Sequence, residues 1–262
     1  MRGRAILGTI VLCTAAMIGA GYAHPFGDPR SGVAVAGSKD AGKMLENAQI
    51  PAEAKAVLIA KCVNCHSEAT QWPRYARIAP WSWLIDRDVM EGRQYMNLSK
   101  WAELTPDDRQ ILESKIIQQA RNGDMPPIQY RALHWGAKLS TENLQALSIL
   151  GKEGGPVEVI AAGIGDAERG KAIFNKHCTS CHAMDVDREG PKLRGVFGRK
   201  AGEVPGFKYS AALKASGITW DKDSLNKWLS DTDVMIPDNA MGFRVIKASE
   251  RLDLIEYLKQ TK

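Results

Sequence analysis

The sequence has few cysteines, and none that could form a disulfide once two short motifs are set aside. Of its five cysteines, four fall in these motifs, and the fifth, Cys13, lies in an apolar N-terminal stretch. Secretion therefore cannot be argued from disulfides and has to be argued from the leader. The chain also lacks any convincing alternation of apolar and polar residues of the kind that indicates β-strands. We predict an all-α fold.

The sequence also has little net charge. It contains 35 Lys and Arg against 30 Asp and Glu, a formal charge of +5 that includes two arginines in the first four residues. So small an excess excludes the strongly basic proteins that bind nucleic acid through their phosphates. The 262 residues, with 44% hydrophobic and 25% charged residues, are typical of globular protein and suffice for one large domain or two small ones.

The first 23 residues have the pattern of a leader. A basic start, Met-Arg-Gly-Arg, precedes an uncharged apolar stretch over 5–23, and small residues before His24 suit cleavage by a signal peptidase. An uncleaved membrane anchor is the alternative, because 5–23 is close to the shortest stretch that spans a bilayer. Both interpretations place the body of the protein in the periplasm or on the extracytoplasmic face of the membrane.

Two pentapeptides carry the chemistry: Cys62-Val-Asn-Cys65-His66 and Cys178-Thr-Ser-Cys181-His182. Each reads C-x-x-C-H, the attachment signal for haem c. The two cysteines can form thioethers to one edge of the porphyrin, and the histidine can then bind the iron. A zinc site needs a second ligand pair at suitable spacing, and a thioredoxin-like pair leaves the histidine unexplained. We predict two covalently attached haem c groups.

Composition and helix signals divide the chain. After the leader (1–23) we predict a tether (24–46), an N-terminal haem-binding domain (47–151), a linker rich in glycine (152–165) and a C-terminal domain (166–262). Cap residues predict helices that begin after Thr105, Asp166 and Ser249. A further helix is expected from Ser140 to Leu150, and helix-forming residues predict another over 52–61. The latter would bring the first motif to its haem.

The N-terminal domain is rich in aromatic residues over 67–104, which would supply the apolar walls of a haem pocket. Met125 begins a proline-stiffened loop and could offer its thioether as the sixth iron ligand. His134 is the rival, because imidazole is the other common axial ligand. Both remain open at this point.

The C-terminal half contains several short motifs that together resemble a known family. Its distinctive stretches are Gly190-Pro191-Lys192-Leu193, Phe197-Gly198-Arg199-Lys200, Pro205-Gly206-Phe207, Tyr209-Ser210, Gly217-Ile218-Thr219-Trp220 and 253–258. Through them, residues from about 164 to 262 resemble the mitochondrial-type class I cytochromes c. The resemblance implies a helical domain in which Gly170 and Phe174 on the first helix cross Leu254 and Tyr257 on the last.

The same resemblance implies roles around the haem. His182 would be held by the Pro191 carbonyl, and the inner propionate would be bound by Arg199, Tyr209 and Trp220. Met241 would be the sixth ligand, with Met235 as the nearest competing sulfur. The chain departs from the family in the segment Pro237-Asp238-Asn239-Ala240, which leads to this methionine, and in having Trp228 where a tyrosine is common.

The N-terminal domain is similar to a small bacterial family of haem-binding domains. The likeness rests on the C-x-x-C-H-S motif, Trp72-Pro73-x-Tyr75, Ser82-Trp83-Leu84, Gly92-Arg93 and Met125-Pro126-Pro127. It implies a second module with one haem. Together the two resemblances predict two cytochrome c-like helical haem domains in tandem.

These features predict electron transfer and no catalysis, because histidine and methionine would fill both axial positions of each iron. Redox proteins would dock near the second haem edge, where Lys171, Lys192 and Lys200 could form part of a basic rim. The alternative is an ordinary solvated face on which these lysines are interspersed with acidic residues. The alternatives are a dihaem peroxidase or small-substrate oxidoreductase with a displaceable ligand on the first haem, and the electron-input subunit of a membrane respiratory complex.

Overall fold

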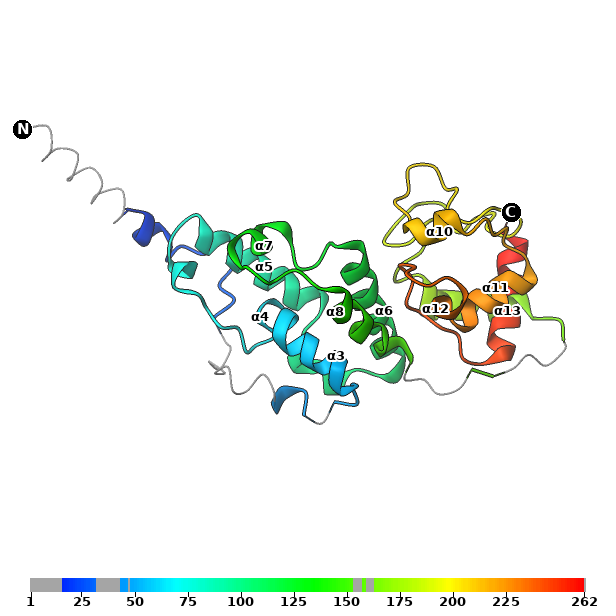
Figure 1. The fold of residues 1–262 in the computed structure, drawn as a ribbon, viewed down its shortest axis with the longest axis horizontal. Coiled ribbons are helices and arrows are strands. Elements are labelled where there is room, and N and C mark those ends of the chain that lie inside the picture. Colours follow the sequence, from blue (N-terminus) through cyan, green and yellow to red (C-terminus); the bar gives the residue numbers. More distant parts are fainter. Residues whose placement is uncertain (1–15, 32–42, 47, 153–156, 159–162, 262) are drawn as a thin grey trace, which may run out of the picture. The chain divides into compact units, whose positions relative to one another are not determined.

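The structure, a computed structural model, describes residues 16–31, 43–46, 48–152, 157–158 and 163–261 (Figure 1). Within them the regular secondary structure is helical, apart from one isolated antiparallel bridge between Lys200 and Thr219. The prediction of an all-α fold is confirmed. No helix among the described residues is long and apolar enough to cross a membrane. Most of the predicted leader, residues 1–15, lies outside the described part.

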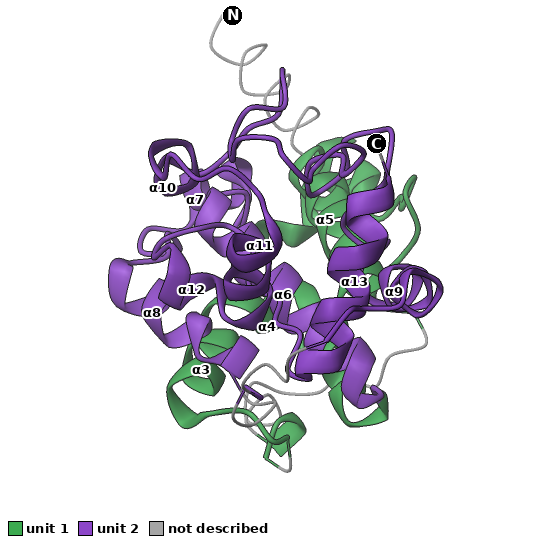
Figure 2. Ribbon diagram, turned by 90° about the vertical axis from the view of Figure 1, so that its right-hand side faces the viewer, with its two compact units in different colours: residues 1–103 green, residues 104–262 purple. Residues whose placement is uncertain are grey.

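The chain forms two compact units, residues 1–103 and 104–262 (Figure 2). This division differs from the predicted domains, which placed 47–151 together. The reason lies in helix α6 (Pro106–Asn122), which is bonded to the C-terminal segment. Its Gln110 donates to the Arg244 carbonyl at 2.8 Å, and its Arg121 pairs with Asp233 at 2.7 Å. The boundary between the compact units therefore lies before α6, at residues 103–104, and not at the predicted linker over 152–165.

In the first unit, the first motif lies at the end of a continuous helical run after Pro51. The run consists of α3 (Ala52–Val57), the π-helical turn η1 (Leu58–Cys62) and α4 (Val63–His66). Helix α5 (Trp81–Tyr95) packs against α4 and carries Gly92 and Arg93. Two 3₁₀ turns, η2 (Arg74–Arg77) and η3 (Leu98–Glu103), complete the unit. The predicted helix over 52–61 is therefore present and continues through the motif.

Residues 24–31 do not form the free tether that the sequence predicted. His24 and Arg30 both reach the carboxylate of Asp86, each at 2.7 Å, and the Trp83 indole donates to the Ala20 carbonyl at 3.1 Å. The Asp86 side chain is fully buried. A buried carboxylate needs charged or hydrogen-bonding partners, and this segment supplies them. Residues 32–42 of the predicted tether lie outside the described part.

In the second unit, cap residues define several helix ends as predicted. Thr105 caps α6 and Gly123 ends it in the left-handed conformation, at φ 74°. Ser140 caps α8 (Thr141–Ser148) and Asp166 caps α9 (Ala167–Ile173). The remaining elements are α7 (Ile128–Leu133), η4 (Leu150–Lys152), η5 (Phe174–Cys178), α10 (Ala211–Ala215), α11 (Lys222–Ser230), α12 (Thr232–Met235) and α13 (Ala248–Gln260). The final helix begins at Ala248, so the prediction that Ser249 caps it is wrong.

Helices α9 and α13 pack tightly against each other (Figure 2). At the crossing, a Cβ atom on Gly170 would lie 2.0 Å from the Asp253 carbonyl oxygen and 2.8 Å from Cβ of Tyr257. Only glycine permits so close an approach of two backbones. The crossing that the resemblance implied at Gly170 is present, and it places the end of α9 and the second motif beside the core of the unit.

Candidate functional site

The two motifs share an unusual local backbone. Each is preceded by a five-residue π-helical turn that ends at its first cysteine: Leu58–Cys62 in η1 and Phe174–Cys178 in η5. In each, the N–H of the residue after that cysteine donates to the carbonyl five residues back, Val63 to Leu58 and Thr179 to Phe174. Both carbonyl-bearing residues are buried. Isolated π turns are rare and concentrate at functional sites.

The histidine of the second motif is firmly oriented. Its Nδ1 lies 2.7 Å from the Pro191 carbonyl oxygen, as the resemblance implied. Since a carbonyl can only accept, Nδ1 carries the proton and Nε2 keeps its lone pair. Gly190 lies against the ring so closely that a Cβ there would be 2.3 Å from it. Burial lowers the pKa of His182. The neutral imidazole is the form that binds metal.

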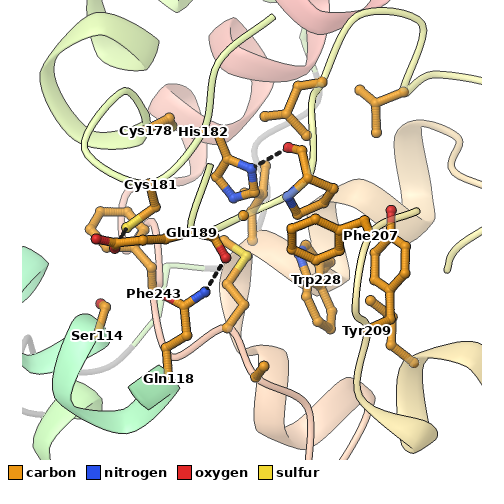
Figure 3. A pocket seen from close by; sticks show the side chains of 18 of the residues that line it. Ser114, Gln118, Cys178, Cys181, His182, Glu189, Phe207, Tyr209, Trp228 and Phe243 are labelled. Carbon is orange, nitrogen blue, oxygen red and sulfur yellow. Dashed lines mark hydrogen bonds between the residues drawn. The ribbon is translucent and has the colours of Figure 1, made fainter. Parts of the chain in front are cut away.

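A cavity opens beside this histidine within the second unit (Figure 3). Cys178, Cys181 and His182 line it together with Met241. Most of its wall is apolar and comes from Phe174, Leu193, Val196, Trp220, Leu225, Trp228, Leu229, Leu254 and Leu258. Two cysteines, an imidazole and a methionine in the wall of one apolar cavity are groups that can hold a c-type haem.

The three residues expected at a propionate also line this cavity. Arg199 donates to the carbonyls of Lys192 at 2.9 Å and Arg194 at 3.2 Å, and burial lowers its pKa. Burial raises the pKa of Tyr209, whose ring meets Phe207 edge-on at 4.8 Å. Trp220 is buried. A guanidinium held at the wall of an apolar cavity suits an anionic group there.

The loop that presents Met241 is held by side chains that the sequence reasoning missed. Asn239 is fully buried, and its Oδ1 accepts the Met241 N–H at 2.7 Å. Its Nδ2 donates to the Ile236 carbonyl at 2.9 Å and to Asp233 at 3.1 Å. Thr232 donates to the Met241 carbonyl at 2.5 Å. The segment that departs from the family is thus tightly bonded.

The competing sulfur belongs to Met235, at the end of helix α12. Met235 packs against the apolar core and does not appear among the described residues that line the cavity, whereas Met241 does. Asn239, two residues before Met241 and after a proline, was the signal that could have pointed to the bonded loop, because asparagine side chains often bond the backbone two residues on.

Helix α6 also contributes to the cavity wall, through Ile111, Ser114, Gln118 and Asn122. Gln118 Nε2 donates to the Glu189 carbonyl at 2.6 Å, next to Cys181 (Figure 3). No local pattern could have predicted this, since the two residues are 71 positions apart. From the sequence, residues 106–122 were predicted to belong to the N-terminal haem-binding domain (47–151).

The first motif shows the same histidine arrangement within its own unit. His66 Nδ1 lies 2.8 Å from the Gly92 carbonyl oxygen and 3.2 Å from that of Met96. A Cβ on Gly92 would be 2.8 Å from the Cys65 carbonyl oxygen, so glycine is needed for α5 to approach the motif. Burial lowers the pKa of His66. Arg93 fixes the following turn by donating to Ser67 and Thr70.

The two candidates for the sixth ligand of the first motif lie in the second unit. Met125 is 40% exposed, and its N–H donates to the Gln119 carbonyl at 3.3 Å. His134 Nδ1 lies 3.0 Å from the Tyr130 carbonyl oxygen, and its ring stacks on Tyr130 at 3.9 Å. The choice of Met125 stays a prediction.

The cysteine chemistry separates the possible uses of the motifs. Burial raises the pKa of Cys62 and Cys178 to about 12 and that of Cys65 to about 11. A reactive redox pair needs the opposite shift, toward the thiolate. Among the described residues, no group of three or more His, Cys, Asp or Glu could hold a metal ion. Partly buried thiols with a raised pKa beside an oriented imidazole fit thioether attachment of a haem better than a reactive redox pair.

Comparison with known proteins agrees with this geometry. Residues 167–262 match the family described as Cytochrome c. The cytochrome c of Euglena viridis is 46% identical over 101 residues, which cover 37% of this chain and 99% of that protein. The chain belongs to the cytochrome c family. Residues 30–150 match a second family, described as Haem-binding domain.

Other relatives cover the same C-terminal part. Cytochrome c type-1 of Ascaris suum is 42% identical over 99 residues, 88% of its length. Among solved structures, cytochrome cH from Methylobacterium extorquens is 41% identical and ferricytochrome c2 from Rhodopseudomonas palustris 32% identical, each with a TM-score of 0.35. They cover 36% and 37% of this chain and 98% and 99% of their own. As a family member, the chain binds haem c and transfers electrons.

Proposed function

We propose that the chain is a dihaem cytochrome that carries electrons between extracytoplasmic redox proteins, with one haem c on each motif. The observation that carries the proposal is the repeated geometry. Each motif follows a π turn, and each motif histidine has its Nδ1 beside a backbone carbonyl, Gly92 for His66 and Pro191 for His182. Two sites built to the same plan are best explained by the same group in both.

The residues divide the work of holding each haem. Cys62 and Cys65, or Cys178 and Cys181, form the thioethers, and His66 or His182 binds the iron through Nε2. The hydrogen bond at Nδ1 fixes the ring and increases its basicity. Bound haem supplies a one-electron couple, and the protein sets its potential through the ligands and through burial.

For the sixth positions we propose Met241 on the second haem and Met125 on the first. Methionine ligation raises the reduction potential and leaves no open position for oxygen or peroxide. Met241 is supported by its place in the cavity wall and by its bonded loop. Arg199, Tyr209 and Trp220 would bind the propionate of the second haem.

Haem attachment is tested by removing one motif at a time in the full chain. Cys62→Ala with Cys65→Ala, and separately Cys178→Ala with Cys181→Ala, should each lower the haem count from two to one. The count is measured by intact mass and by absorbance of the alkaline pyridine haemochrome. Cys13→Ala is the matched control and should keep both haems. A native chain that carried one haem would overturn the dihaem proposal.

The ligands are tested by spectroscopy of the oxidised protein. A methionine bound to ferric haem gives a weak long-wavelength charge-transfer band, which Met241→Ala and Met125→Ala should each reduce. Met235→Ala is the control for Met241→Ala, and Met90→Ala is the control for Met125→Ala. If Met125→Ala left the band unchanged and the native protein oxidised a donor cytochrome with peroxide, the peroxidase alternative would replace electron transfer at the first haem.

A further inference from the structure

Helix α6 belongs by sequence to the match with the haem-binding domain, yet it bonds to the segment that contains Met241. Arg121, in its last turn, reaches Asp233 with two nitrogens, NH1 to Oδ1 at 2.7 Å and NH2 to Oδ2 at 3.1 Å. NH1 also donates to the Asn239 carbonyl at 2.7 Å. The two charged side chains are only 14% and 18% exposed. This is a bidentate, charge-assisted contact, the strongest class of hydrogen bond between side chains.

These contacts lead directly to the methionine. Asp233 accepts a second hydrogen bond from Asn239 Nδ2 at 3.1 Å, and the same amide accepts the Met241 N–H at 2.7 Å. Arg121 therefore holds Asn239 from two sides, through its backbone carbonyl and through the carboxylate that its side chain contacts. The position of the Met241 backbone depends on Asn239, and Asn239 is held by a residue of α6.

Two further contacts keep α6 at this place. Ile117 lies against Gly242, the residue after Met241, so closely that a Cβ on the glycine would be 2.8 Å from its Cδ1. Gln110 donates to the Arg244 carbonyl at 2.8 Å. The helix thus contacts the chain on both sides of the methionine.

We propose that Arg121 is a positioning residue for Met241: it fixes the methionine loop of the second haem from a helix that lies outside the cytochrome c segment. The proposal rests on the proposed function, in which Met241 is the iron ligand. It assigns a role to Asn239, one of the residues in which this segment departs from the family pattern. Asn239 accepts a hydrogen bond from Arg121, which lies outside the cytochrome c segment, and bonds to the Met241 backbone.

The role requires the shape of arginine as well as its charge. A guanidinium contacts both carboxylate oxygens and a carbonyl together, whereas an ammonium acts as a point charge. Removing one partner from a buried charged hydrogen bond leaves the other unsatisfied. For Arg121→Ala we expect the equilibrium between bound and dissociated methionine to shift about tenfold or more toward dissociation. Arg121→Lys should have an intermediate effect.

The experiment uses the full-length holoprotein. The charge-transfer band of methionine bound to ferric iron is recorded during a pH titration, and the reduction potentials of both haems are measured. Met241→Ala defines the part of the band that belongs to the second haem. In Arg121→Ala that part should be lost at lower pH than in the native protein. The reduction potential that falls in Met241→Ala, which is that of the second haem, should also fall in Arg121→Ala. Arg131→Ala is the control, because Arg131 lies in α7 and its side chain bonds to none of the described residues of the C-terminal segment.

The outcomes separate the two proposals. If Met241→Ala leaves the band intact, the ligand assignment fails. If Met241→Ala removes its part of the band but Arg121→Ala behaves as the native protein, Met241 is the ligand and the positioning role is overturned. If Arg121→Ala does not fold, Asp233→Asn decides, because it keeps the size of the side chain and removes its charge. A native-like band and potential in Asp233→Asn would likewise overturn the role.

Discussion

The close approach of the α9 and α13 backbones at Gly170 can be tested with the variant Gly170→Ala, which adds a single methyl group. The added Cβ would lie 2.0 Å from the Asp253 carbonyl oxygen, 2.5 Å from its carbonyl carbon and 2.8 Å from Cβ of Tyr257. All three neighbours are backbone or the root of a side chain, so none can rotate away. The helices must separate by about 1.4 Å for the Cβ to reach ordinary contact with this oxygen, at 3.4 Å. A gap of about 1 Å already forfeits up to half of the dispersion energy of the atoms concerned.

The expected cost follows from two opposing effects. Overpacking of a close contact costs about 3 kcal/mol at the upper end of its usual range. Alanine is favoured over glycine in a helix by about 1 kcal/mol. We therefore expect Gly170→Ala to lower the free energy of unfolding by about 2 kcal/mol. With a denaturant slope of about 2 kcal/mol/M, the urea midpoint should fall by about 1 M.

The assay is urea unfolding of the full-length holoprotein, followed by far-UV circular dichroism and Soret absorbance. Lys171→Ala is the matched control, because it changes the next residue of α9, which is exposed, and should shift the free energy of unfolding by less than about 0.5 kcal/mol. If Gly170→Ala were as stable as Lys171→Ala, the two backbones could not be in the contact described, and the argument for the crossing would fail.

Two further predictions follow from the remaining contacts. The hydrogen bond from Arg169 holds the pKa of Asp253 below its ordinary value of 3.8, and the carboxylate is only 8% exposed. Its contribution to stability is complete above pH 3.8 and is lost as the pH falls through the lower folded value. Asp253→Asn should therefore be less stable at pH 7, and its stability should fall less on acidification, as urea midpoints at several pH values would show; parallel curves would contradict this. Gly92→Ala should lower haem attachment at the first motif while leaving the second intact, because its Cβ would lie 2.8 Å from the Cys65 carbonyl oxygen. Haem counting by intact mass checks it. The control is Gly163→Ala, whose Cβ would meet only Leu252 Cδ1, at 3.8 Å, and equal counts in both variants would refute the prediction.

Local features were predictable from the sequence because their causes are local. Thr105 and Asp166 cap helices as expected, since a side-chain oxygen there bonds an N–H three residues on. Ser140, from which a helix was expected, also serves as a cap. Ser249 failed because the backbone turned into the helix two residues earlier, after Lys247.

The partners of the motif histidines show the limit of the resemblance. For the second motif, the family supplied the Pro191 carbonyl, nine residues from His182, and the structure contains that bond. For the first motif no such partner was expected, and the carbonyl of Gly92 takes the place at a separation of 26 residues. The glycine was visible in the sequence, but its use depends on α5 packing against α4, which a pattern along the chain does not show.

The division of the chain was the least predictable feature, and it bears most on function. Motifs assign α6 to the haem-binding match over residues 30–150, whereas its hydrogen bonds assign it to the unit that holds the second haem site. The two assignments do not conflict, because the family match reflects sequence similarity and the division into units reflects packing. Helix α6 lies outside the cytochrome c match over residues 167–262 and yet bonds to the loop that contains Met241. A change at Arg121 should then alter the second haem, although this residue is not part of the cytochrome c segment.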